Sequence, residues 1–324
     1  MRLAAGALCF ALVACGAAPP APLPPSGDNA AQSADEGPRE DDLRLTLVEP
    51  GAAPRRELRY RYPIGKAEPI EIAMKMTITI VNGEAAPGAA APPTTKAELP
   101  TIKTQIRIDP LGVSPAGDLK YEFHVVKTSV DGDVPIPPEL REKLEAELGR
   151  MNGTGGWALV SPRGLVKRSV YEIPRDAPPE VAQTMESLRQ AMQQLATPFP
   201  AEAVGVGARW ETVSSVKTQL VKMTQTTRYQ LAEWTGDRGT LKIEVSQVAP
   251  PQQVQMPATP PGVTWNLESL TTNGTGNARF DLTKVAPLSD TQVHTRTALR
   301  AEKDGQAQRL VTEVDMTVGL RAAK

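Results

Sequence analysis

The chain has 324 residues, 40% of them hydrophobic, and a formal net charge of −1. Its length and composition suit one large or two small folded domains, and the near-zero charge excludes the broad basic surface of a nucleic-acid-binding protein. Both cysteines, Cys9 and Cys15, lie near the N-terminus, and the only histidines are His124 and His294. We therefore expect no disulfide, no metal site and no cofactor in the folded part.

The first residues predict an export signal. Arg2 precedes an apolar run that ends at Ala14 and is too short to cross a bilayer. The run closes with Leu12, Val13 and Ala14, and Cys15 follows. This order resembles the lipobox of bacterial lipoproteins.

The lipobox resemblance implies that residues 1–14 are a signal peptide and that Cys15 carries the lipid. The protein is then expected in the bacterial cell envelope, held to a membrane by its acyl chains. Gly16 stands where such lipoproteins carry Asp for retention in the inner membrane, so the resemblance points to the outer membrane. Two or three buried acyl chains anchor a protein stably, because each methylene contributes about 0.8 kcal/mol.

Residues 15–42 are predicted to form a disordered tether. The segment is rich in Pro, Ala and acidic residues, and its one large aliphatic residue is Leu23. Such a composition buries too little apolar surface to fold. We expect this segment to space the folded part from the membrane.

The remaining sequence alternates between apolar and polar residues, which is typical of antiparallel strands with one wet face. The clearest example covers 69–81, where all the even-numbered residues are Ile or Met. Further strands are predicted at 101–108, 119–125 and 310–320.

Two amphipathic helices interrupt these strands. One covers 137–148, with Leu140, Leu144 and Leu148 on one face. The other covers 178–195 and carries a stripe of Val181, Met185, Leu188, Met192 and Leu195. Neither polar face is basic, so both helices are expected to pack on the sheet rather than on a membrane.

The tetrapeptide NGTG occurs at 152–155 and again at 273–276. A second shared pattern, G-x-L-K-apolar-E-apolar, begins at Gly117 and at Gly239, at nearly the same spacing from each NGTG. This coincidence predicts an internal repeat, with a first β unit at 43–197 that holds both helices and a second at 198–324. The repeated glycines are expected to supply unusual φ angles where the chain enters a strand.

The predicted fold is therefore mainly β with two helices (α+β). In it, a duplicated antiparallel β unit forms curved sheets, a half-barrel or a sandwich. The run from Pro200 to Trp210 and the SPRG turn at 161–164 are similar to features of uncharacterised bacterial lipoproteins with duplicated β-rich units. That resemblance covers 55–324 and implies no activity.

Catalytic residues are scarce. His124 and His294 are expected on the wet faces of strands, and no serine lies in a G-x-S-x-G elbow. Asp131 and Asp133 flank a glycine like the start of a calcium loop, but the later ligands are missing, which indicates a turn. We expect a protein that is not an enzyme.

Three functions remain open. The first is a binding or carrier protein for an apolar or lipid-like ligand, similar in outline to the half-barrel lipid carriers of the envelope, with Met74, Met76, Ile106 and Phe123 as the ligand face. The second is an adaptor that binds a protein partner through a sheet edge. The third is a hydrolase that uses paired carboxylates.

Overall fold

The structure is a computed structural model. It describes residues 43–62, 64–82, 93–172, 196–217, 221–256, 259 and 261–323. The predicted signal peptide, the lipobox residues, Cys15, the tether and the second predicted helix lie outside the described residues.

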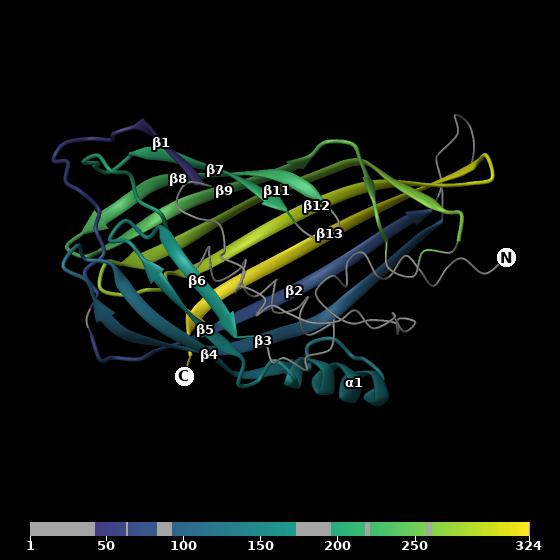
Figure 1. Ribbon diagram of the computed structural model, residues 1–324, viewed down its shortest axis with the longest axis horizontal. Helices are drawn as coiled ribbons and strands as arrows, with labels where there is room; N and C mark the ends of the chain where they lie inside the picture. Colours follow the sequence, from purple (N-terminus) through teal and green to yellow (C-terminus); the bar gives the residue numbers. More distant parts are fainter. Residues whose placement is uncertain are drawn as a thin grey trace, which may run out of the picture.

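The described chain folds into one antiparallel sheet and one helix (Figure 1). The elements are β1 (Leu43–Glu49), β2 (Glu68–Asn82), β3 (Thr94–Val113), β4 (Leu119–Val130), α1 (Pro138–Gly149), β5 (Gly155–Val160), β6 (Val166–Glu172), β7 (Arg209–Lys217), β8 (Lys222–Thr235), β9 (Arg238–Ala249), β10 (Gln252–Val254), β11 (Thr264–Asp281), β12 (Leu288–Lys303) and β13 (Gln306–Ala322).

The strand order is β1-β7-β8-β9-β11-β12-β13-β2-β3-β4-β5-β6, with β10 paired to β11 outside this path. The sheet is open, with β1 and β6 at its two ends, and every strand pair in it is antiparallel. Strands from both predicted units join in this one sheet, because β13 pairs with β2 and β1 pairs with β7. Antiparallel β structure was predicted from the alternation and is confirmed.

Local sequence explains the connections between strands. The β12–β13 hairpin turns at Asp304 and Gly305, which have φ angles of 49° and 77°. Two-residue hairpins need such positive φ values, and Asp-Gly adopts them readily. The predicted SPRG turn joins β5 to β6, where the amide of Gly164 donates to the carbonyl of Ser161 at 2.9 Å.

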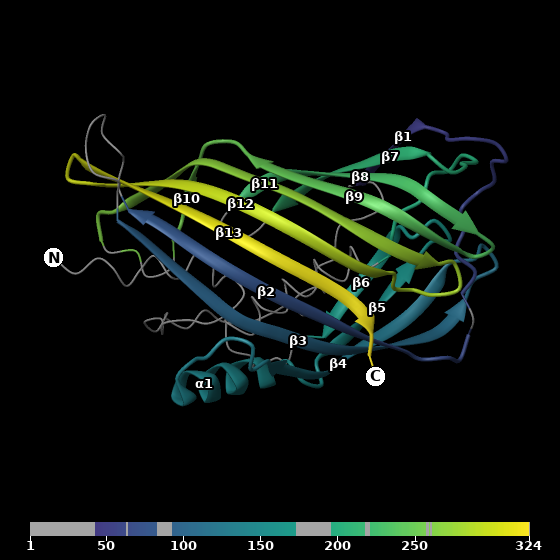
Figure 2. The ribbon, with the colours of Figure 1, turned by 180° about the vertical axis from the view of Figure 1, so that it is seen from behind.

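The sheet curls and has one concave face (Figures 1 and 2). The buried apolar residues lie on this face. The larger cluster of buried residues joins β7, β8, β9 and β11 on one side to β3, β4 and β5 on the other. A smaller cluster lies at the opposite end of the long strands and includes Ile78, Ile80, Leu267, Leu299 and Leu310. The core therefore has two separate parts at the two ends of the concave face.

Two segments outside the strands complete the larger cluster. Residues 50–62 and 196–208 run beside each other, and the amides of Arg56 and Val204 each donate to the other's carbonyl at 3.0 Å. They bring Tyr60 and Phe199 into contact, with ring centroids 5.0 Å apart, and Phe199 in turn meets Phe280 at 5.2 Å. We call this part of the concave face the aromatic end.

Helix α1 begins with Pro138 in its first turn, as predicted, and contacts β4. Strand β5 pairs only with Leu119–His124 of β4, so the later residues of β4 pair with β3 on one side and have no described strand on the other. The helix and the loop after it lie beside this part of β4, and the Arg141 guanidinium donates to the carbonyl of Val130 at 3.3 Å. Of the predicted apolar stripe, Leu148 is buried but Leu140 is 45% exposed. The helix thus mainly covers the edge of β4 that β5 leaves unpaired, and it packs little on a face of the sheet.

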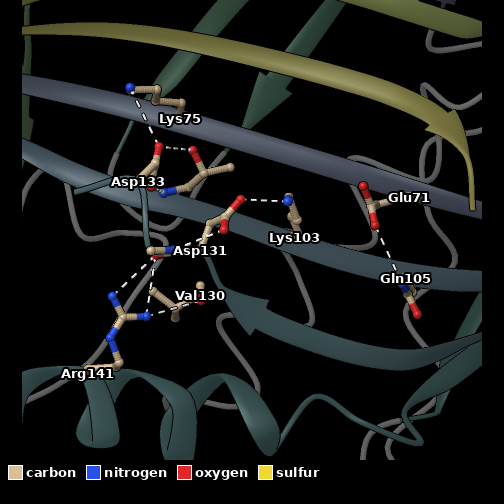
Figure 3. A network of polar contacts seen from close by, with 10 residues as sticks. Glu71, Lys75, Lys103, Gln105, Val130, Asp131, Asp133 and Arg141 are labelled. Carbon is tan, nitrogen blue, oxygen red and sulfur yellow. Dashed lines mark hydrogen bonds and ion pairs between the residues drawn. The ribbon is translucent and has the colours of Figure 1, made fainter. Parts of the chain in front are cut away.

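The turn between β4 and α1 is held to the convex face by ion pairs (Figure 3). Lys103 Nζ lies 2.6 Å from Asp131 Oδ2, and the Asp133 carboxylate accepts from the amide and hydroxyl of Thr101 at 3.0 and 2.7 Å. The Thr101 hydrogen bonds, with Lys75 nearby, lower the pKa of Asp133 to about 2. The Asp-Gly-Asp sequence is therefore a turn, as predicted, and both carboxylates are engaged by the protein.

The predicted duplication is not confirmed, and the two NGTG segments occupy different places. The first spans a turn and the start of β5, whereas the second lies within β11. Of their four glycines, Gly153 alone has a positive φ, so the expectation of unusual φ angles was wrong for the other three. A Cβ on Gly276 would lie 2.6 Å from the carbonyl oxygen of Asp290. Close approach to β12 explains the glycine there.

Candidate functional site

The centre of the concave face carries apolar side chains that belong to neither buried cluster. We call them the middle strip, which consists of Val245, Val293, Met316, Val318, Met74 and Ile102. All six are half-buried, whereas each of these strands also carries a buried cluster residue, such as Leu241, Leu299, Leu310, Ile78 and Ile106.

The strand register makes the middle strip continuous. Val245 of β9 lies opposite Gly274, which lies opposite Val293 of β12, and Val293 lies opposite Met316 of β13. One step along, Val318 lies opposite Met74 and Met74 lies opposite Ile102. Because opposite residues of neighbouring strands point to the same face, these side chains form one apolar row across six strands.

In β11, the residues that stand in line with the middle strip are glycines. Gly274 and Gly276 both fall on the concave face, because they lie opposite Val293 and Thr291 and alternate with the exposed Asn273 and Thr275. Side chains of β12 lie against both glycines, because a Cβ on Gly274 would lie 3.0 Å from Val293 Cγ2 and a Cβ on Gly276 would lie 2.6 Å from Thr291 Oγ1. The second NGTG thus allows β12 to approach β11 closely in the middle of the sheet.

The four predicted ligand-face residues do not form one site. Ile106 and Phe123 are 1% and 0% exposed and pack inside the larger cluster. Met76 packs against the smaller cluster, and Met74 lies in the middle strip. All four face the concave side, but they are spread along its length.

The aromatic end contains buried polar groups. Glu68 is 6% exposed, and both of its carboxylate oxygens accept from the amide of Val285, at 3.1 and 3.0 Å. Burial raises the pKa of Glu68 above its ordinary value, although the hydrogen bond from Val285 opposes this. Burial likewise raises the pKa of Tyr229 to about 12. Glu68 ties the start of β2 to the β11–β12 connection.

A hollow of about 540 Å³ lies over β8, β9, β11, β12, β13 and β2 and is lined mostly by polar residues of the convex face, with Val245, Val293 and Met316 also among its lining. It contains His294, whose Nδ1 is 2.8 Å from Asp315 Oδ1, and also Ser246. Asn273 of β11 stands between Ser246 and His294 in the register. A nucleophilic serine must contact its base, so these residues do not form a catalytic triad.

The two histidines lie on the wet face of the sheet, as predicted. His124 and His294 are both exposed on the convex face. Within the described residues, no group of three or more His, Cys, Asp and Glu side chains is placed to hold a metal ion. None of the described helices has the length and apolarity that a membrane crossing requires.

Sequence reasoning missed the aromatic end. Tyr60, Tyr62 and Phe199 lie outside the strands, where no alternation marks them as buried. The signals available were the closely spaced tyrosines of the run RYRYP and the phenylalanine between two prolines at 198–200.

One family model matches part of this chain. It describes a family of unknown function (DUF6263) and matches residues 182–284, under a third of the sequence. The matched region runs through β7 to β11 and includes Val245 and Gly274 of the concave face. No curated protein matches the chain.

Proposed function

We propose that this protein is a lipid-anchored protein of the bacterial envelope that binds an apolar, lipid-like ligand on its concave face. The anchor is Cys15, as the lipobox implies. The ligand lies along the middle strip, between the aromatic end and the smaller cluster. The protein acts as a binding or carrier protein and performs no chemistry on the ligand.

The observation that carries this proposal is the contrast along single strands. In β2, Ile70 and Ile78 are 4% and 3% exposed, while Met74 between them is half-buried. Ligand sites for apolar molecules are concave and lined by apolar side chains, and methionine adapts to ligands of varied shape. The strip also lacks charged side chains, which suits an acyl chain.

The proposal is tested by titrating the purified protein with a fluorescent fatty acid. We expect binding by the wild type and its loss in Val318→Gln, which places an amide in the middle strip. Thr317→Gln is the matched control, because Thr317 is the neighbouring residue on the convex face. Native mass spectrometry of the purified protein should show a co-purified lipid. Absence of binding in the wild type would refute the proposal.

A second function is favoured by the open sheet. Strand β1 pairs only with β7 and strand β6 pairs only with β5 within the described residues, so each offers a free edge for an extended peptide. Edge pairing gives affinity through backbone hydrogen bonds. If the protein is an adaptor of this kind, the wild type should not bind the fluorescent fatty acid. Replacing Thr46 of β1 or Lys167 of β6 by proline should then abolish binding of the protein partner.

The internal duplication also remains a proposal. Strands β2 to β6 and strands β7, β8, β9, β11 and β12 each form a run of consecutive antiparallel neighbours. The two G-x-L-K motifs fall at the start of the third strand of each run, β4 and β9. A crystal structure in which the two runs fail to superpose strand for strand would contradict duplication.

A further inference from the structure

The convex face of β4, β5 and β6 carries an aromatic residue between two cations. Lys120 Nζ lies 4.8 Å and Arg168 Cζ 5.5 Å from the ring centroid of Trp157. Lys120 of β4 lies opposite Leu159 of β5, and Leu159 lies opposite Arg168 of β6. The three strands therefore present Trp157, Leu159, Lys120 and Arg168 together on one face.

We call the four residues Lys120, Trp157, Leu159 and Arg168 the Trp157 patch. Leu111 and Val113 of β3 are 46% and 36% exposed but are not part of it, because the register places Val113 opposite the buried Leu119.

The charges of the Trp157 patch differ from those around it. Many basic side chains elsewhere on the convex face form ion pairs, such as Arg296 with Glu313 at 3.3 Å. Lys167, next to the patch, is neutralised by Asp118 at 2.9 Å. Lys120 and Arg168 lie instead against the indole of Trp157. The nearby carboxylate, Glu122, lies opposite Trp157 in the register and is 3.8 Å from His124 Nε2.

We infer that the Trp157 patch docks the folded part on the surface of an anionic membrane. Tryptophan is enriched at membrane–water interfaces, where its ring lies at the level of the head groups. Basic side chains beside it, here Lys120 and Arg168, are attracted to the head groups of anionic lipids. The docked sheet would lie on the bilayer through β4–β6, whatever ligand its concave face binds.

The test compares full-length protein on vesicles of phosphatidylcholine with and without phosphatidylglycerol. Any lipid anchor enters both vesicles alike, so the difference between them reports the patch. Each basic side chain near an anionic surface strengthens binding roughly fivefold. We expect the pair Lys120→Gln and Arg168→Gln to reduce the preference for phosphatidylglycerol by roughly thirtyfold.

The matched control removes two cations from another part of the convex face. Lys242 of β9 and Arg279 of β11 are exposed, and replacing both by Gln changes the net charge equally. This control should keep the preference. Val318→Gln should keep it too, because that change affects only the concave face. An equal loss in the two cation pairs, or no preference in the wild type, would overturn the inference.

A second measurement needs no charge variant. Phospholipids brominated near the head group should quench part of the tryptophan fluorescence of the vesicle-bound protein, and Trp157→Phe should remove the quenched part. Quenching that persists in Trp157→Phe would assign the contact to another tryptophan and would refute the Trp157 patch as the docking surface.

Discussion

Truncating Ile78 and truncating Met74 should have very different costs, although both residues point from β2 to the concave face. Ile78 is 3% exposed in the smaller cluster, where it lies opposite Val314 and Ala97. Ile78→Ala removes three buried carbons, worth about 2.4 kcal/mol at 0.8 kcal/mol each. The cavity that remains brings the expected loss to about 2–5 kcal/mol.

Met74 is half-buried and packs in neither cluster. Met74→Ala should therefore forfeit about half of a full burial contribution, or about 1 kcal/mol. The cavity penalty should be small, because Met74 is only half-buried. Urea unfolding followed by tryptophan fluorescence gives the free energy of unfolding of both variants. Equal losses would show that the middle of the concave face is packed as tightly as its ends, and would refute the proposed ligand site.

Three further results are expected. Cys15→Ser should move the protein from the membrane fraction to the soluble fraction, and retention in membranes would contradict the lipid anchor. Ile78→Asp should cost more than ~4 kcal/mol because it buries an unpaired carboxyl, while Thr77→Asp on the convex face should change stability by ~0.5 kcal/mol or less; equal melting temperatures would show that the alternation was misread. Glu68→Gln should remove a pH dependence of the free energy of unfolding. The pKa of Glu68 is raised above 4.5 in the folded state, so between pH 4.5 and the raised pKa the folded state binds more protons than the unfolded state. Wild-type stability should therefore fall as pH rises through this range. A difference between wild type and Glu68→Gln that stays constant from pH 4 to pH 7 would contradict this.

The strands were predictable because each has one wet face. The period of two places 69–81 in β2 and 310–320 in β13, and the structure confirms both. Alternation identifies the face to which a residue points but not how much of that face is covered. Ile72, Met74 and Met76 are half-buried, whereas Ile70, Ile78 and Ile80 are buried, although all six are large apolar residues in one pattern.

Other parts of the site depend on contacts between distant segments. Ile106 and Phe123 were predicted to line the ligand face, but Phe123 meets Tyr171 at 5.2 Å and Ile106 lies within the same cluster as Phe199. The residues that fill this end come from 50–62 and 196–208, whose irregular sequence carries no period. The strand register places Gly274 opposite Val293 and Val245. This register is set by the pairing of distant strands, so the local sequence pattern does not predict it.

Under the proposed function, the division of the core would separate stability from ligand binding. A curved sheet needs apolar contacts across its concave face, and here the two ends supply them. The aromatic end joins β7 to β4 through large rings, and the smaller cluster joins β3 to β11 through aliphatic side chains. The strands between these ends are held by backbone ladders along their whole length. The middle strip is therefore not needed to fix the register. A face that stays apolar without being required for packing is free to bind another apolar molecule.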